Sequence, residues 1–256
     1  MTDVAHVVSG RPDAPTVVLA NSLGSTWEMW DANLADWEQH FRVVRFDTRG
    51  HGRSPVPPGP YDIDDLADDV VVLLDRLGVE RAHFVGLSLG GMTGMRLAAR
   101  NPERVDRLVV LCTGARLDPA SAWTERAELV RAKGSAAVAE AVVRRWFTAA
   151  RLESDPMLRD RSEAMVASTP AEGYASCCEV IATMDLLPDL AGISAPTLAV
   201  AGADDPATPP WQLERIANSV AHGNLLVVPG AAHLAAAERP DLIDPAVIAH
   251  LLGAGE

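Results

Sequence analysis

Short, mainly apolar runs recur along the chain and predict strands. They lie at residues 16–20, 41–46, 82–85, 105–112, 195–201 and 225–228, and a further run at 4–8 has the character of an edge strand. Apolar runs without regular alternation are typical of strands that are covered on both faces, as in parallel sheets. The sequence therefore predicts a mostly parallel central sheet.

Helical patterns separate these runs. Apolar residues recur three and four positions apart at 27–39 and 61–77, and helices are also expected around 95–99, at 211–219 and on both sides of Arg239 and Pro240. Strands that alternate with helices are the pattern of an α/β domain with helices on both faces of the sheet. A chain of 256 residues is long enough to bury a large core of this kind.

The alternation stops in one long segment, residues 118–187. This segment has a helical pattern throughout, with candidate helices at 122–132, 135–147, 156–167 and 171–184. A helical insertion late in an α/β chain is expected to lie over the carboxyl ends of the strands, where open sheets bind ligands. We therefore divide the chain into a core, residues 1–117 and 188–256, and a helical cap, residues 118–187.

Charge and composition narrow the classes of function. The formal net charge is -13, which argues against nucleic acid or an anionic membrane as partner and means that an anionic substrate would need a local cationic pocket. Three cysteines without a Cys-x-x-Cys or Cys/His cluster suggest neither a disulfide framework nor a metal site. We expect a cytoplasmic protein without metal; the sequence leaves open whether it forms a homo-oligomer.

The pentapeptide Gly86-Leu87-Ser88-Leu89-Gly90 carries the clearest chemical signal. It follows the strand pattern at 82–85 and precedes a helical pattern, so a strand, a sharp turn and a helix are expected. In this context Gly-x-Ser-x-Gly is a nucleophile elbow, in which a strained serine is exposed at the turn and the glycines allow close passage of strand and helix. Ser88 is the candidate nucleophile.

Later loops supply a candidate acid and base. Asp204 and Asp205 follow the strand at 195–201, and His233 follows the strand at 225–228. Serine, acid and histidine in this chain order are expected of an α/β-hydrolase, in which histidine deprotonates serine and the carboxylate orients the histidine. The fold class predicted is therefore the α/β-hydrolase fold, and either aspartate could be the acid.

Two further loops contain candidate catalytic groups: one offers a rival base and acid, and the other an oxyanion-hole donor. His51 and Asp47 also follow a predicted strand and are rivals for base and acid, but they precede Ser88 in the chain. The loop after residues 16–20 could contribute an oxyanion-hole donor, for which we choose the backbone N–H of Leu23. The other donor would be the N–H of Leu89, directly after the nucleophile.

Several blocks together resemble the 3-oxoadipate enol-lactonases of the β-ketoadipate pathway. These blocks are Leu19-Ala20-Asn21-Ser22-Leu23-Gly24, Asp47-Thr48-Arg49-Gly50-His51-Gly52, residues 86–92, Arg145-Trp146-Phe147-Thr148, Gly173-Tyr174-Ala175-Ser176-Cys177-Cys178, residues 201–210 and Ala232-His233-Leu234. The triad blocks are common to many α/β-hydrolases. The Asn-Ser-Leu-Gly loop and the two cap blocks, at 145–148 and 173–178, indicate the lactonases.

The resemblance implies a substrate and further site residues. It implies cofactor-free opening of a small anionic enol-lactone to 3-oxoadipate in aromatic catabolism, and it favours Asp205 as the acid. Arg145 beside Trp146 is the candidate site for the substrate carboxylate, with Arg144 and Arg49 as rivals. A general small-acyl carboxylesterase and a non-enzymatic ligand receptor on the same fold are the competing interpretations.

Overall fold

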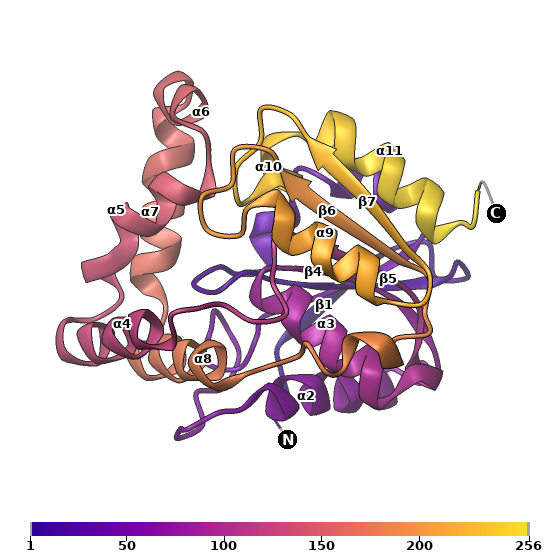
Figure 1. The fold of residues 1–256 in the computed structure, drawn as a ribbon, viewed down its shortest axis with the longest axis horizontal. Helices are drawn as coiled ribbons and strands as arrows, with labels where there is room; N and C mark the ends of the chain where they lie inside the picture. The colour runs from indigo at the N-terminus through magenta and orange to yellow at the C-terminus, as the bar shows by residue number, and fades with distance from the viewer. Residues whose placement is uncertain (1, 255–256) are drawn as a thin grey trace.

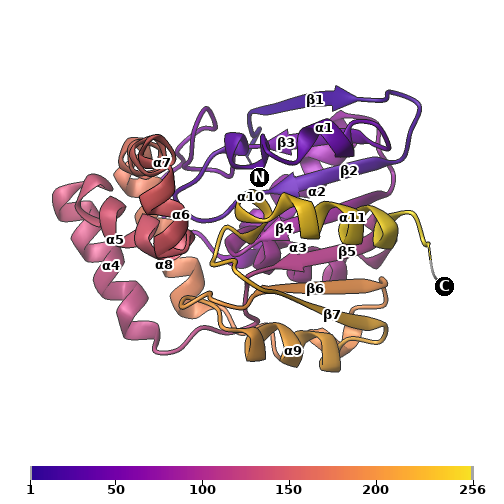
Figure 2. The same cartoon turned by 90° about the horizontal axis from the view of Figure 1, so that it is seen from above.

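The computed structural model describes residues 2–254 and contains one seven-stranded sheet. The strand order is β1-β3-β2-β4-β5-β6-β7, with β1 antiparallel to β3 and the other neighbouring pairs parallel (Figure 2). The strands are β1 (His6–Gly10), β2 (Thr16–Ala20), β3 (Arg42–Phe46), β4 (Ala82–Leu87), β5 (Val105–Leu111), β6 (Thr197–Gly202) and β7 (Gly223–Val228). This confirms the predicted mostly parallel sheet.

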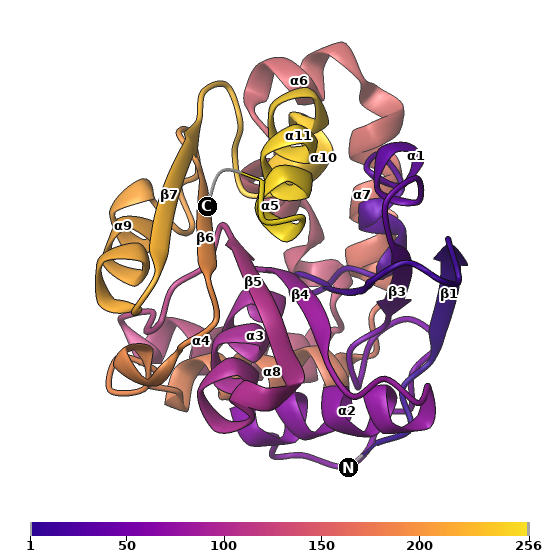
Figure 3. The ribbon, with the colours of Figure 1, turned by 90° about the vertical axis from the view of Figure 1, so that its right-hand side faces the viewer.

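Helices cover both faces of the sheet. One face carries α2 (Ile63–Arg76), α3 (Leu89–Arg100) and α9 (Pro210–Ser219), and the other carries α1 (Leu34–Trp37), α10 (Ala235–Glu238) and α11 (Pro240–Leu251) (Figure 3). The central strands β2 and β4 are buried almost throughout, which explains their uninterrupted apolar sequences. No helix among residues 2–254 is long and apolar enough to cross a membrane.

A group of helices between β5 and β6 lies beyond the carboxyl ends of the strands (Figure 1). It comprises α4 (Ala120–Lys133), α5 (Ala136–Trp146), α6 (Ala149–Ser154), α7 (Pro156–Ser168) and α8 (Ala171–Thr183). The short helix α6 has no counterpart in the sequence pattern; Thr148 caps its start by accepting a hydrogen bond from the Arg151 N–H. We call this group the helical insertion.

One predicted element differs from the structure. The pattern at 27–39 suggested one helix, but the chain forms a 3-10 helix at Trp27–Trp30 and, after a break, the short helix α1. At the break, the buried Asn33 side chain donates hydrogen bonds to Ala236 O (2.9 Å) and Asp244 Oδ1 (2.7 Å). These tertiary contacts outweigh the helical periodicity that the tryptophans produce.

The turn between β4 and α3 is packed backbone against backbone. A Cβ atom on Gly86 would lie 2.2 Å from Gly90 O, and one on Gly90 would lie 2.3 Å from Ala20 O. Backbone atoms cannot rotate away as a side chain can, so only glycine fits at either position. The two glycines of the pentapeptide are therefore required by the passage of α3 across β4 and β2.

Replacement of Gly90 by alanine is expected to destabilise the protein by about 1–3 kcal/mol, because the added methyl group must displace the backbone of β2. Gly192→Ala is the matched control, since a Cβ there has no atom within 4 Å. Urea unfolding of both variants measures the difference. Equal free energies of unfolding for the two variants would contradict the packing argument.

Candidate active site

Ser88 sits at the tip of the turn in a strained conformation. Its φ of 56° and ψ of -113° fall outside the regions that L-residues normally occupy. The Ser88 N–H donates to Leu111 O (2.9 Å), and the Thr113 hydroxyl donates to Ser88 O (2.7 Å). Because β5 and its following loop hold both sides of the Ser88 backbone, the side chain is presented at the start of α3.

His233 and Asp205 are brought together at the same edge of the sheet. The Nδ1 atom of His233 lies 2.9 Å from Asp205 Oδ2, and both residues are buried. Burial alone would raise the pKa of the Asp205 carboxyl, but the charge of His233 and hydrogen bonds from His233 and Thr208 hold that pKa below its usual range. The carboxylate can therefore hold the imidazole with Nδ1–H toward itself and Nε2 available as a base.

The two adjacent aspartates have different surroundings. Asp205 accepts hydrogen bonds from the Ala207 N–H (2.8 Å), the Thr208 N–H (3.1 Å) and the Thr208 hydroxyl (2.6 Å). The Asp204 side chain is exposed. Asp205, the aspartate that the resemblance favours as the acid, thus contacts His233 and also braces its own loop.

Two backbone N–H groups near Ser88 remain available. Among residues 2–254, neither the Leu23 N–H nor the Leu89 N–H donates a hydrogen bond. Leu89 is the first residue of α3, whose N-terminus carries partial positive charge. Leu23 lines the same pocket as Ser88 and His233, and Leu89 directly follows Ser88 in the chain.

The rival base and acid have structural partners instead. The Nε2 atom of His51 accepts a hydrogen bond from the Gly24 N–H (3.0 Å), and burial lowers the His51 pKa to about 4. Asp47 accepts hydrogen bonds from the Trp27 N–H and the Arg53 N–H, both at 2.9 Å. Burial outweighs these bonds and raises the Asp47 pKa. Neither residue lines the pocket that contains Ser88.

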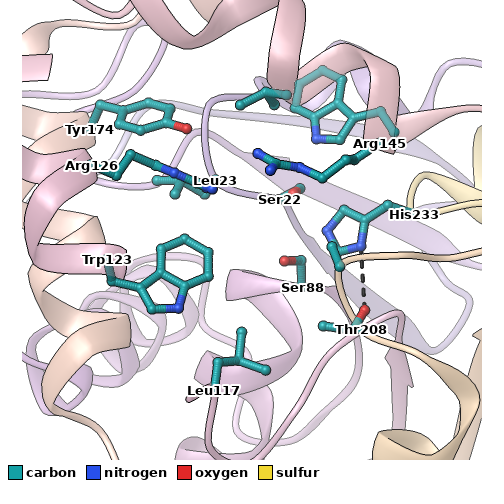
Figure 4. Close-up of a pocket in the computed structure, with 13 residues that line it drawn as sticks. Ser22, Leu23, Ser88, Leu117, Trp123, Arg126, Arg145, Tyr174, Thr208 and His233 are labelled. Atoms are coloured by element: carbon teal, nitrogen blue, oxygen red, sulfur yellow. Dashed lines mark hydrogen bonds between the residues drawn. The ribbon is translucent and has the colours of Figure 1, made fainter. Parts of the chain in front are cut away.

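A pocket joins the elbow to the helical insertion. It is a small cavity of about 50 Å³ that opens to solvent, below the usual range for drug-sized ligands. Figure 4 shows Ser88, His233 and Thr208 on one side and Trp123, Arg126 and Tyr174 from the insertion on the other, with the Arg145 guanidinium between Arg126 and His233. Its lining residues include no aspartate or glutamate.

Arg145 and Trp146 both line this pocket, as the sequence analysis expected of the carboxylate site. Burial, followed by the nearby charge of Arg126, lowers the Arg145 pKa. The rivals lie elsewhere: Arg144 is exposed and paired with Glu140, and Arg49 is buried against Asp69 at 2.6 Å. Arg145 is therefore the one of the three arginines whose guanidinium faces the pocket.

The structure adds residues that the sequence analysis did not select. Arg126 lies over the Trp123 ring, 4.5 Å from its centroid, and neither Arg126 nor Arg145 forms an ion pair with a carboxylate of residues 2–254. The Tyr174 side chain is buried and belongs to the pocket lining. The block containing Tyr174 was quoted for its resemblance, but nothing in the pattern of α4 marks Arg126.

The insertion is also tied to the loop of His233. The N–H groups of His233 and Leu234 donate to Arg145 O (3.3 Å) and Trp146 O (2.7 Å), which are carbonyls at the end of α5. Glu238 accepts the Thr148 N–H on one oxygen and the Ala232 N–H on the other, both at 2.9 Å. The candidate base and the candidate anion-binding side chain thus share one hydrogen-bonded junction.

A strained serine between β4 and α3, with a buried histidine–aspartate pair on later loops, defines an α/β-hydrolase site. The family model described as alpha/beta hydrolase fold matches residues 15–240, and the chain belongs to this family. Its relatives make it a hydrolytic enzyme that acts on esters, which leaves the receptor interpretation without support.

The names of individual relatives describe narrower activities than the family name does. The 3-oxoadipate enol-lactonase 2 of Acinetobacter baylyi is 40% identical over 96% of this chain and 92% of its own. The crystal structure of an enol-lactonase from Burkholderia xenovorans has a TM-score of 0.96 and 40% identity, covering 98% of this chain and 97% of its own. A Caulobacter protein with the provisional name carbamate hydrolase RutD is 32% identical over 97% and 95%. The resemblance to enol-lactonases is confirmed.

Replacement of Asp205 by asparagine is expected to lower kcat by about 10⁴-fold, because an amide no longer selects the imidazole tautomer with Nε2 free. Asp204→Asn is the control and should change kcat by less than about twofold, since its side chain is exposed. Steady-state ester hydrolysis by the two folded variants measures the effect. A larger loss of kcat in the Asp204 variant would show that Asp204, and not Asp205, is the acid.

Proposed function

We propose that this enzyme opens the lactone ring of 3-oxoadipate enol-lactone with water to give 3-oxoadipate, a step of the β-ketoadipate pathway. The observation that carries the proposal is a small pocket containing Ser88 and His233 beneath two guanidinium groups, with no carboxylate in its lining. Such a pocket suits a compact ester that bears a negative charge. The names of the relatives at 40% identity support the same substrate.

The proposed reaction begins with attack by the Ser88 hydroxyl oxygen on the lactone carbonyl carbon. His233 Nε2 takes the serine proton, and Asp205 stabilises the imidazolium that results. The tetrahedral oxyanion accepts hydrogen bonds from the N–H groups of Leu23 and Leu89. Each such donor is typically worth about 10²–10³ in rate.

Ring opening follows when the bond from the carbonyl carbon to the ring oxygen breaks. The leaving oxygen is that of an enol, and the imidazolium of His233 returns its proton to this oxygen. Conversion of the tethered enol to a ketone then prevents it from attacking the acyl-enzyme. Water, deprotonated by His233, attacks the ester carbon, and Ser88 leaves with the proton to release 3-oxoadipate.

The substrate carboxylate would be held by Arg145 together with Arg126. A protein of net charge -13 repels anions at long range, so binding depends on local positive charge. Many arginines of this chain are paired with carboxylates, as Arg49, Arg96 and Arg131 are. Two guanidinium groups without such partners in one pocket supply the local charge, and Trp146 supplies an apolar wall.

The alternative function for the same triad is that of a general small-acyl carboxylesterase. Such an enzyme would hydrolyse charged and neutral esters alike. Replacement of Arg145 or Arg126 by glutamine should lower kcat/KM for the enol-lactone by about 10–100-fold, because hydrogen bonds to a charged group are lost. The same variants should hydrolyse the neutral ester p-nitrophenyl acetate within about threefold of the wild type.

Arg144→Gln is the matched control for this comparison, because Arg144 neighbours Arg145 but is exposed and paired with Glu140. Parallel kinetics on the two substrates measure the ratio of kcat/KM values. An equal loss on lactone and neutral ester would reject carboxylate recognition. A wild-type enzyme that prefers neutral esters or a carbamate would reject the proposed substrate.

A further inference from the structure

In the loop that follows β2, the Leu23 N–H is the one backbone donor between Ser22 and Ser25 that has no acceptor among residues 2–254. Of the N–H groups from Ser22 to Ser25, that of Ser22 donates to the Met29 sulfur (3.4 Å), that of Gly24 to His51 Nε2 (3.0 Å) and that of Ser25 to Ser22 O (3.1 Å). The Leu23 N–H donates to no residue in the range 2–254. The donors on both sides of Leu23 are therefore occupied by side chains of other segments.

The peptide unit that contains the Leu23 N–H is held in place through its carbonyl group. A peptide unit is planar and trans, so its C=O and N–H point in opposite directions. The carbonyl of this unit is Ser22 O, which accepts hydrogen bonds from the Ser25 hydroxyl (2.7 Å) and the Ser25 N–H. A carbonyl fixed toward Ser25 directs the Leu23 N–H the opposite way, and Leu23 lines the pocket of Ser88.

The peptide unit on the far side of Leu23 is held by His51. An N–H group can only donate, so His51 Nε2 must be the acceptor and Nδ1 must carry the proton. Nδ1 lies 3.2 Å from Arg49 O, which accepts that proton. Burial keeps the ring neutral, with a pKa of about 4, so this tautomer is maintained across the neutral range.

We infer that Ser25 and His51 are positioning residues that keep the Leu23 N–H directed at the reacting carbonyl oxygen. The inference rests on the acyl transfer at Ser88 described under the proposed function. Met29 supports the arrangement, because its sulfur accepts the Ser22 N–H and lies 3.1 Å from the Ser25 hydroxyl. If these contacts are lost, the peptide units on either side of Leu23 can rotate and the donor turns away from the oxyanion.

The inference can be tested with Ser25→Ala, which removes the hydroxyl but keeps the backbone bond, and His51→Leu, which removes the acceptor. Each is expected to lower kcat by about tenfold with KM within about twofold, on both the enol-lactone and p-nitrophenyl acetate. The oxyanion forms with either substrate, so the loss should not depend on substrate charge. His51→Gln, whose side-chain oxygen can accept the Gly24 N–H, should restore most of the rate.

A second readout separates positioning from stability. A boronic acid that forms a tetrahedral adduct with Ser88 should bind the Ser25 and His51 variants about tenfold more weakly than the wild type, whereas product affinity stays unchanged. Thermal melting gives the folded fraction to which kcat is normalised. A normalised kcat equal to that of the wild type, or a change in KM alone, would overturn the inference.

The neutral ester keeps this test apart from the substrate assignment. An enzyme that hydrolyses p-nitrophenyl acetate but not the enol-lactone would reject the proposed function and still report on Ser25 and His51. Conversely, normal ester and lactone turnover by both variants would overturn the positioning roles and leave the proposed function intact.

Discussion

The close packing of α3 against the sheet at Ser88 is the constraint on which the active site depends. Gly86 and Gly90 bring backbone atoms together where a Cβ would collide, and the Gly90 N–H donates to Asn21 O (3.0 Å). The elbow and the loop after β2 are therefore one hydrogen-bonded unit. Ser88 and the N–H groups of Leu23 and Leu89, which donate to no acceptor among residues 2–254, are held by this unit before substrate binds, as the proposed oxyanion hole requires.

Contacts of α5 also link the candidate anion site to the loop of the candidate base. Arg145 presents its guanidinium to the pocket while its carbonyl accepts the His233 N–H, so one residue of α5 touches both functions. Glu238 strengthens this junction by bridging Thr148 and Ala232. A shift of α5 would therefore move Arg145 and the loop of His233 together.

Much of this arrangement could be predicted because it follows from local rules. Apolar runs marked the sheet, and the glycine spacing around Ser88, together with loops at the carboxyl ends of strands, marked Asp205 and His233. Other features depend on tertiary contacts that no local pattern records. The break before α1 arises from contacts of Asn33 with segments more than 200 positions away, and Arg126 lies on a helix whose sequence resembles any exposed helix. His51 was a rival base because it follows a predicted strand. The sequence does not show that its ring accepts a hydrogen bond from the Gly24 N–H.

The central claim is that Ser88 becomes covalently acylated and that a cationic pocket selects the acyl group. Rapid quenching of the enzyme with enol-lactone, followed by intact-mass and peptide analysis, tests it most directly. Because the leaving group stays tethered, the account predicts a transient adduct on Ser88 with the mass of the whole substrate, and a loss of about 10⁶-fold in kcat for Ser88→Ala. Lactone turnover without such an adduct, undiminished in Ser88→Ala, would contradict it.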